Sequence, residues 1–375
     1  MTALYIGGGS PSTLPPAYAE RLFAHLAKVV PQYDTIEKTF TGEPRTLRRP
    51  ELLKLLQEFK FDRITFGIET FNERIRKSIG RYDTREDIDA VFSGLDAVGS
   101  TASRCVDMMY DLPGQTLKDW EEDLSTLVEN YQPDELDAFG TVYLPYRPMH
   151  RLIVKGKLEQ PGSIWQLLKM RELVYDYMLD KGYHNPIGET FSKTDERTQY
   201  QKAHCARQDI VAVGCAARGN LKDMVSINPS KLDDWYSNID QYGVSTKTLQ
   251  PIGRDGVLDR IMVMFPRYKE IDKDLLNRFS DTRRYPKVLK LLKKQIKLGL
   301  VQEHDDRYTL EKLGVLWLGN VQTDYLKHTV NLPGRMLLRT VGEKKAYFDR
   351  QKRFGLNAAT RFILGHLDLY PRLMK

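Results

Sequence analysis

Hydrophobic and polar positions alternate with two different periods along the first 150 residues. Short apolar runs, rich in β-branched and aromatic residues, are separated by longer segments in which apolar residues recur every three or four positions. These runs predict strands at 4–6, 34–40, 63–68, 102–109 and 135–144, with amphipathic helices between them, as at 15–30 and 84–98. Strands and helices that alternate in this way predict parallel βα units. We therefore expect an α/β fold whose sheet curves into a partial barrel.

The pattern becomes mainly helical after residue 161. A helix is predicted at 163–180 and a last strand at 183–189, whereas 192–220 is polar and irregular around an apolar patch at 210–215. Farther on, helical segments precede two short strand candidates, which predicts a mostly helical, winged-helix-like domain. We expect four segments: the partial barrel at 1–160, an extension at 161–240, the winged-helix-like domain at 241–328 and a basic amphipathic tail at 329–375.

The first predicted strand ends in three glycines, Gly7, Gly8 and Gly9, followed by Ser10. Because glycine has no Cβ, another molecule can approach the backbone closely at such a tip. In barrel-like α/β folds the carboxyl ends of the strands are where ligands bind. The glycine tip therefore predicts a ligand platform, with a flexible turn between strand and helix as the alternative.

Composition limits the classes of protein. The chain has 375 residues, 41% of them hydrophobic, and no apolar run reaches the roughly 18 residues that would span a bilayer. Its three cysteines are too few for a disulfide framework, so we expect a cytoplasmic setting. Residues 241–375 carry 27 Lys and Arg against 14 Asp and Glu. This basic part could contact nucleic acid, an acidic membrane surface or a polycarboxylate ligand, or could be solvated helix surface.

Three stretches carry a resemblance to a known family. They are Tyr-Ile-Gly-Gly-Gly-Ser-Pro-Ser at 5–12, Asp-Arg-Ile-Thr-Phe-Gly-Ile-Glu-Thr-Phe-Asn at 62–72, and Val-Asp-Met-Met-Tyr-Asp-Leu-Pro-Gly-Gln-Thr at 106–116. In this order and spacing they closely resemble the oxygen-independent coproporphyrinogen oxidase-like branch of the radical S-adenosylmethionine enzymes. The resemblance covers roughly residues 1–325. It includes 209–217, which looks like the family's glycine-bearing strand.

The resemblance implies a partial barrel of the radical S-adenosylmethionine type, in which a 4Fe-4S cluster reduces bound S-adenosylmethionine. It implies a tetrapyrrole substrate and an electron donor such as flavodoxin or ferredoxin. Arg218-Gly-Asn-Leu resembles more narrowly the haem-utilisation subgroup, which opens the haem macrocycle anaerobically. A non-enzymatic haem carrier is the alternative, since some members of this branch resemble chaperones. Nucleic-acid binding ranks last.

The resemblance also implies cofactor-binding residues. Gly7, Gly8, Gly9 and Ser10 would lie against the amino acid end of S-adenosylmethionine. Glu69 stands where the family usually has glutamine, and would accept a hydrogen bond from a ribose hydroxyl. Arg81 could pair with the cofactor carboxylate, with a surface ion pair as the alternative. Asp107 matches the family's ribose-contacting aspartate, and an aspartate in an apolar strand needs a partner.

Two positions depart from the family pattern in this region. The family normally carries a glutamate where this chain has Thr41, and Glu43 could replace it, or could be a solvated turn residue. Asp111 replaces the glycine that usually precedes Leu-Pro-Gly-Gln-Thr. If that position requires a positive φ, aspartate tolerates it better than most residues.

The family's substrate-facing stretch corresponds to the irregular region of this chain. Arg197 and Arg218 are candidates for pairing with porphyrin propionates, and His204 is a candidate ligand of haem iron. A structural or exposed histidine is the alternative for His204. Cys215, in an apolar run, is expected in the core. No catalytic residue and no metal site are assigned.

The main departure from the family is an absent motif. Members carry Cys-x3-Cys-x2-Cys, which ligates the iron–sulfur cluster, upstream of the glycine strand, and none of Cys105, Cys205 and Cys215 has that spacing. Either the chain lacks the family's first βα unit through truncation, or it is a cluster-free relative. A sheet without its first strand exposes a long parallel edge, which favours truncation. We expect this chain to be inactive without the cluster segment.

Overall fold

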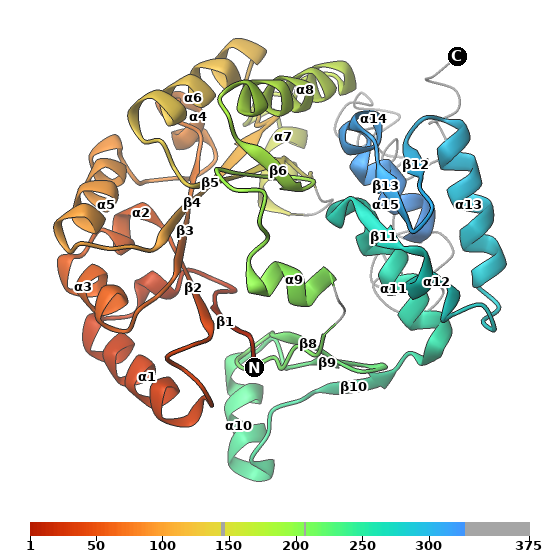
Figure 1. Cartoon of the computed structure of the whole chain (residues 1–375). Helices are drawn as coiled ribbons and strands as arrows, with labels where there is room; N and C mark the ends of the chain where they lie inside the picture. The colour runs from red at the N-terminus through yellow and green to blue at the C-terminus, as the bar shows by residue number, and fades with distance from the viewer. Residues whose placement is uncertain (144–146, 206–207, 327–375) are drawn as a thin grey trace. The chain divides into compact units, whose positions relative to one another are not determined.

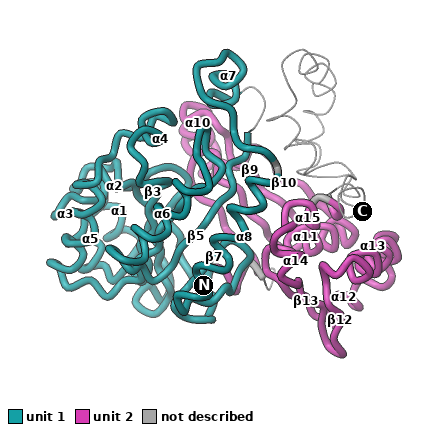
Figure 2. Tube along the Cα trace, turned by 90° about the horizontal axis from the view of Figure 1, so that it is seen from above, with its two compact units in different colours: residues 1–200, 351–362 teal, residues 201–350, 363–375 magenta. Residues whose placement is uncertain are grey.

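The computed structural model describes residues 1–143, 147–205 and 208–326. The chain divides into two compact units: unit 1 begins at Met1 and runs to Tyr200, and unit 2 begins at Gln201 (Figure 2). Of the described helices, none is long and apolar enough to cross a membrane. The tail expected at 329–375 lies outside the described residues.

Unit 1 is built on a curved seven-stranded sheet with the strand order β1-β2-β3-β4-β5-β7-β6 (Figure 1). The first five strands are parallel and confirm the predicted βα pattern: β1 Ala3–Ile6, β2 Glu37–Gly42, β3 Arg63–Glu69, β4 Ser103–Tyr110 and β5 Glu135–Gly140. The strand expected at 183–189 is present but shorter, because it ends at Ile187. Two short antiparallel strands, β6 His184–Ile187 and β7 Thr190–Ser192, form a hairpin there, because Gly188-Glu189 makes a two-residue turn.

Helices cover the outer face of this sheet (Figure 1). The long ones are α1 Pro16–Val29, α3 Pro50–Glu58, α5 Arg85–Ala97, α6 Leu117–Asn130 and α8 Ile164–Asp180, and the short ones are α2 Pro44–Leu47 and α4 Glu73–Ser78. Helix α7 Pro148–Val154 stands apart from the sheet and packs in a small separate cluster with Tyr143 and Leu158 (Figure 2). Capping boxes at Thr84 and Thr116 start α5 and α6.

Side chains alternate along each strand of this sheet. Phe40, Phe66, Met108 and Leu136 point to the helices and form the hydrophobic core with them. The intervening positions point to the inner face, and many of them are polar, including the buried Thr65. A polar inner face inside an apolar shell is where this unit can bind a polar ligand.

Unit 2 contains two small antiparallel sheets, ordered β10-β9-β8 and β11-β13-β12. Helix α9, Gln199–Cys205, leads into it from unit 1. Its further elements are β8 Arg218–Leu221, β9 Met224–Ile227, α10 Leu232–Tyr242, β10 Thr248–Pro251, α11 Gly253–Tyr268, β11 Glu270–Asp272, α12 Lys273–Asn277, α13 Tyr285–Lys297, β12 Val301–Glu303, β13 Arg307–Leu310, α14 Lys312–Leu316 and α15 Leu318–Leu326. The β12–β13 hairpin confirms the predicted pair of strands after the helices.

The glycine-bearing strand expected at 209–217 is wrong. Only Ile210 makes a β-bridge there, to Asn220, while Gly214 has φ +104° and Ala216 φ +61°, which interrupt an extended chain. Cys215 is half-buried rather than in the core, and its thiol donates to the carbonyl oxygen of Pro229 at 3.2 Å. Exposed valines on either side of Ala212 show that this apolar patch is not packed as a strand.

Candidate functional site

The glycine tip follows β1 and requires glycine for two different reasons. A Cβ on Gly7 would lie 2.5 Å from Cε1 of Tyr5, and Gly8 has φ +88°, which side-chain-bearing residues rarely adopt. Neither reason applies to Gly9, where a Cβ would meet no atom within 4 Å. The tip therefore leaves open space beside Gly9, which an approaching ligand could fill.

The loop after β2 is tied to this tip. The Ser12 hydroxyl is 2.7 Å from the Thr46 hydroxyl and accepts a hydrogen bond from the backbone N–H of Glu43 at 3.1 Å. Glu43 is half-buried and precedes α2, while the carbonyl of Ser10 accepts from the backbone N–H of Thr13 at 2.8 Å. Glu43 and Ser10 thus lie on neighbouring loops that hydrogen bonds hold together.

Glu69 ends β3 in an unusual conformation. Its φ is +67°, and the pairing of β3 with β4 shifts register between Gly67 and Glu69. The guanidinium of Arg81 lies 3.7 Å from the Glu69 carboxylate, donates to the carbonyl of Gly67, and forms an ion pair of 3.3 Å with Asp83. Burial raises the pKa of Glu69, and Arg81 opposes this rise. Arg81 is therefore an internally paired residue rather than a surface one.

Asp107 lies on the inner face of β4, level with Gly67 of β3 and Asp137 of β5. Thr65 donates a long hydrogen bond to it, at 3.4 Å. Burial, with the carboxylates of Asp137 and Glu69, raises the pKa of Asp107 to about 8 against the opposing effect of Arg63. At neutral pH this carboxyl group is mostly protonated, so it can donate a hydrogen bond as well as accept one.

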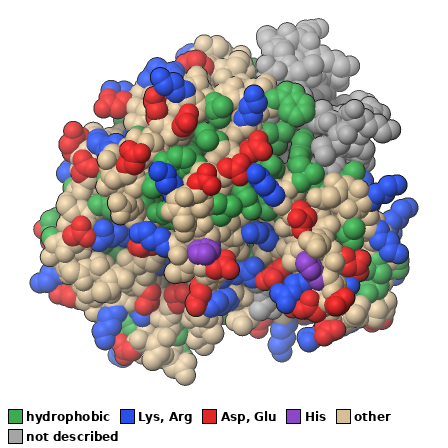
Figure 3. All heavy atoms as spheres, turned by 45° about the horizontal axis from the view of Figure 1, so that its top comes forward, with side chains coloured by type: hydrophobic (Ala, Val, Ile, Leu, Met, Phe, Trp, Pro, Cys, Tyr) green, Lys and Arg blue, Asp and Glu red, His purple; other side chains and the backbone are tan. Residues whose placement is uncertain are grey.

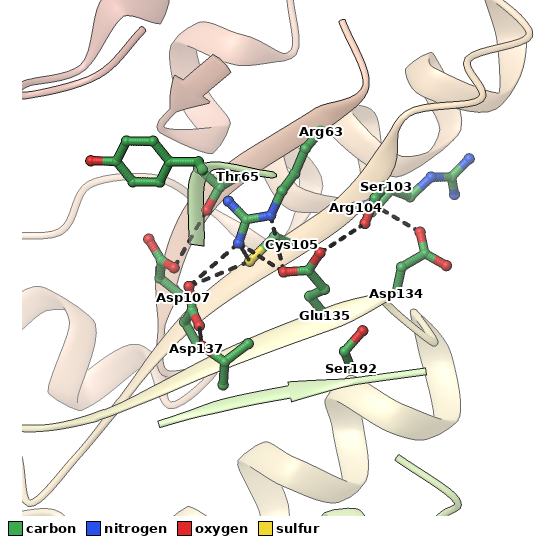
Figure 4. Close-up of polar contacts among 12 residues, drawn as sticks. Arg63, Thr65, Ser103, Arg104, Cys105, Asp107, Asp134, Glu135, Asp137 and Ser192 are labelled. Carbon is green, nitrogen blue, oxygen red and sulfur yellow. Dashed lines mark hydrogen bonds and ion pairs between the residues drawn. The ribbon is translucent and has the colours of Figure 1, made fainter. Parts of the chain in front are cut away.

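An ionic cluster at the base of the inner face was missed by the sequence analysis (Figure 4). Its centre is Arg63, whose guanidinium lies 2.9 Å from the Glu135 carboxylate, 3.5 Å from that of Asp137, and 2.8 Å from the Cys105 sulfur. Thr190 donates to Asp137 from the neighbouring strand. The sequence does contain a sign of this cluster. Polar residues occur at every second position of strands whose other side chains are apolar and buried, so the polar residues must share one face of the sheet.

Three residues on this inner face, a cysteine and two aspartates, are of types that can ligate a metal ion. Single ligand atoms of Cys105, Asp107 and Asp137 lie within 4.8 Å of one another. The guanidinium of Arg63 already contacts two of them, so a cation is present without a metal. Burial also raises the pKa of the Cys105 thiol well above its usual value, which disfavours the thiolate that metals bind.

The three candidate substrate residues fall on both units. Arg197, in unit 1, donates from Nε to the carbonyl of Pro186 at 3.2 Å, beside the β6–β7 hairpin. His204 is on α9, and Arg218 is the exposed first residue of β8 in unit 2. The side chain of His204 is outside the described part of the structure, so its role stays a prediction.

Cavities lie in both units. One of about 360 Å³ in unit 1 is bordered by Phe71, Arg76, Arg81 and Asp83, next to the end of β3. Another, of about 790 Å³, lies in unit 2 between the starts of α11 and α13, and none of the predicted site residues lines it. Of the two, only the cavity in unit 1 adjoins a predicted site residue.

Comparison with known proteins places this geometry in context. The model of the Radical SAM superfamily matches residues 2–127. The chain is 25% identical over 244 residues to the heme chaperone HemW of Bacillus subtilis, covering 65% of this chain and 63% of that protein. It is 22% identical over 376 residues to HemW of Lactococcus lactis, covering 98% and 86%.

A solved structure shares the fold. It is the coproporphyrinogen III oxidase HemN from Escherichia coli, a radical SAM enzyme, which aligns with a TM-score of 0.73 at 21% sequence identity, over 86% of this chain and 77% of that one. This match supports the partial barrel predicted for unit 1. Because identity is this low, it says nothing about activity.

Proposed function

The chain belongs to the coproporphyrinogen oxidase-like (HemN-like) family of radical SAM proteins, and from this premise we propose that it binds S-adenosylmethionine on the inner face of unit 1 and acts on a tetrapyrrole. The observation that carries the proposal is the open space beside Gly9, at the end of β1, in the same parallel sheet whose strands β3 and β4 present Glu69 and Asp107. A backbone without a Cβ suits the amino acid end of the cofactor.

Each residue has a stated task in this proposal. S-adenosylmethionine supplies radical chemistry when it is bound and reduced. Gly9 leaves room for its amino acid end, while Asp107 and Glu69 hydrogen-bond ribose hydroxyls. Arg81, which already pairs with Asp83 and Glu69, also pairs with the carboxylate of the cofactor. A donor such as flavodoxin or ferredoxin would deliver the electron.

The family also implies a 4Fe-4S cluster. The described cysteine side chains do not fit one, because Cys105 is buried against Arg63 and Cys215 belongs to the other unit. No step is derived through a cluster on these residues.

The test is a calorimetric titration of the purified chain with S-adenosylmethionine, comparing the wild type with Gly9→Ala. Ala at position 9 fills the open space without backbone strain, so we expect unchanged thermal stability and an affinity at least about tenfold lower. Gly319→Ala in unit 2, another glycine with open space around its Cβ position, is the matched control and should leave affinity unchanged. Absence of binding to the wild type, or equal binding by Gly9→Ala, contradicts the proposal.

A second candidate function is haem carriage. The observation that favours it is that the HemW relative matched over 98% of this chain is named a heme chaperone. The test is a haem titration followed in the Soret band. A saturable one-to-one shift that is lost in His204→Ala supports carriage, whereas unsaturable binding that is the same in both proteins argues against it.

A further inference from the structure

The guanidinium of Arg76 is buried beside Glu69, outside the inner face of the sheet. Arg76 is on α4 and only 4% exposed. Its Nη1 donates to the carbonyls of Ile68 at 2.7 Å and Thr70 at 2.8 Å, which are the residues on either side of Glu69. One side chain therefore holds the peptide group that precedes Glu69 and the peptide group that follows Thr70.

These hydrogen bonds matter because the backbone of Glu69 is strained. A residue other than glycine at φ +67° is in an unfavourable conformation, which persists only where its surroundings enforce it. A second contact enforces it from α6, where Asp123 accepts from the Thr70 hydroxyl and the Phe71 backbone N–H, both at 2.6 Å. The tip of β3 is held from two helices.

The same guanidinium also places Arg81. Its Nη2 donates to the Asp83 carboxylate at 2.8 Å, and Asp83 in turn pairs with Arg81. The backbone carbonyl of Arg76 accepts from the N–H of Arg81 at 2.9 Å. Two candidate cofactor-binding residues, Glu69 and Arg81, thus depend on one buried side chain that does not itself belong to the candidate site.

We propose that Arg76 is a positioning residue, which fixes the Glu69 carboxylate and the Arg81 guanidinium in the arrangement that receives S-adenosylmethionine. This inference rests on the proposed function. Arginine is required because the side chain makes five hydrogen bonds, including two from Nε and Nη2 to the Asp83 carbonyl. Lysine has three donors on one nitrogen and cannot span these acceptors.

The test compares Arg76→Lys with Arg74→Lys, the same change on the exposed side of the same helix. Arg74 pairs with Glu159 at 2.5 Å, and both side chains are more than half exposed. With folding verified by circular dichroism, we expect Arg76→Lys to bind S-adenosylmethionine about tenfold more weakly and Arg74→Lys to bind within about twofold of the wild type. Equal affinity of folded Arg76→Lys and wild type overturns the inference.

A double-mutant cycle separates positioning from a general loss of structure. If Arg76 acts through Glu69 and Arg81, Arg76→Lys has little further effect on affinity in a background that carries both Glu69→Ala and Arg81→Ala, whereas additive effects contradict the inference. If Arg76→Lys does not fold, Asp83→Asn is used instead, since it weakens the same hydrogen-bonded group, and the same two outcomes apply.

A measurement without ligand keeps this inference distinct from the proposed function. Amide hydrogen exchange of residues 67–71 should be faster in Arg76→Lys than in Arg74→Lys, because the carbonyls around Glu69 lose their donors. Failure of the wild type to bind S-adenosylmethionine would reject the proposed function. Unchanged exchange in Arg76→Lys would reject the positioning role alone.

Discussion

Asp107 shows how the inner face of the sheet changes the chemistry of a single side chain. Its pKa is about 8 in the folded chain, against roughly 4 for an ordinary aspartate. At any pH between these two values, the chain therefore binds a proton at Asp107 when it folds. The unfolded chain binds fewer protons in this range, so the contribution of Asp107 to the free energy of unfolding falls as pH rises from about 4 to about 8.

Asp107→Asn removes this pH dependence, because asparagine resembles the protonated acid and does not titrate. We expect the melting temperature of the variant, relative to the wild type, to rise steadily between pH 5 and pH 8. Thermal unfolding across this range measures it, with Asp96→Asn, which has an exposed side chain, as the control. A difference between Asp107→Asn and wild type that stays constant with pH would show that Asp107 is ionised throughout.

At the scale of elements, β3, β4 and β5 each have one apolar side and one ionic side. The apolar side joins the core under the helices, and the ionic side places Arg63, Cys105, Glu135 and Asp137 together. Burial lowers the pKa of the Arg63 guanidinium, but its acidic neighbours outweigh this and raise it, so it stays charged. The three strands are therefore joined by a buried cation as well as by backbone hydrogen bonds.

Arg63→Met should leave two carboxylates in a buried position without their cation. We expect a loss of about 3–5 kcal/mol in the free energy of unfolding, measured by urea denaturation. Lys193→Met, which breaks an ion pair of 3.4 Å with Asp134 where both side chains are nearly half exposed, should cost no more than about 1 kcal/mol. Similar losses in the two variants would mean that the Arg63 cluster is well hydrated.

At the scale of the whole molecule, the candidate residues for the two ligands are divided between the units. The cofactor residues all lie in unit 1, whereas Arg218 and His204 lie beyond Tyr200. Acidic and basic side chains are interspersed over the described residues on the face drawn in Figure 3, which is not a continuous basic surface of the kind that binds nucleic acid.

Separate titrations should distinguish these two groups of residues. We expect Asp107→Ala to weaken S-adenosylmethionine binding and leave haem affinity unchanged, and Arg218→Ala to weaken haem binding about three- to tenfold by removing a charge-assisted hydrogen bond to a propionate. Both are measured on the full chain, by calorimetry and by the Soret band respectively. If either variant changes both affinities, the two ligands share residues.

The amino-acid sequence by itself determined the five parallel strands of unit 1 and helices between them such as α1 and α5. The spacing of apolar residues and the residues that cap a helix are local properties of a chain. For this reason β3, β4 and the helix caps at Thr84 and Thr116 were predictable. Asp111, expected to tolerate a positive φ, has φ +63°. The three motifs were sufficient for the family.

Only the tertiary structure decided which polar side chains meet. Arg63 and Glu135 are 72 residues apart, and strand register, which no local pattern specifies, brings them into contact. The same holds for Arg76, a charged residue on a short helix, whose side chain donates two hydrogen bonds to carbonyls beside Glu69 and three to Asp83. The interruption of the expected strand at 209–217 depends on left-handed backbone at Gly214 and Ala216, which apolar composition alone does not reveal. Local chemistry specified the elements of this protein, and long-range packing assembled its candidate site.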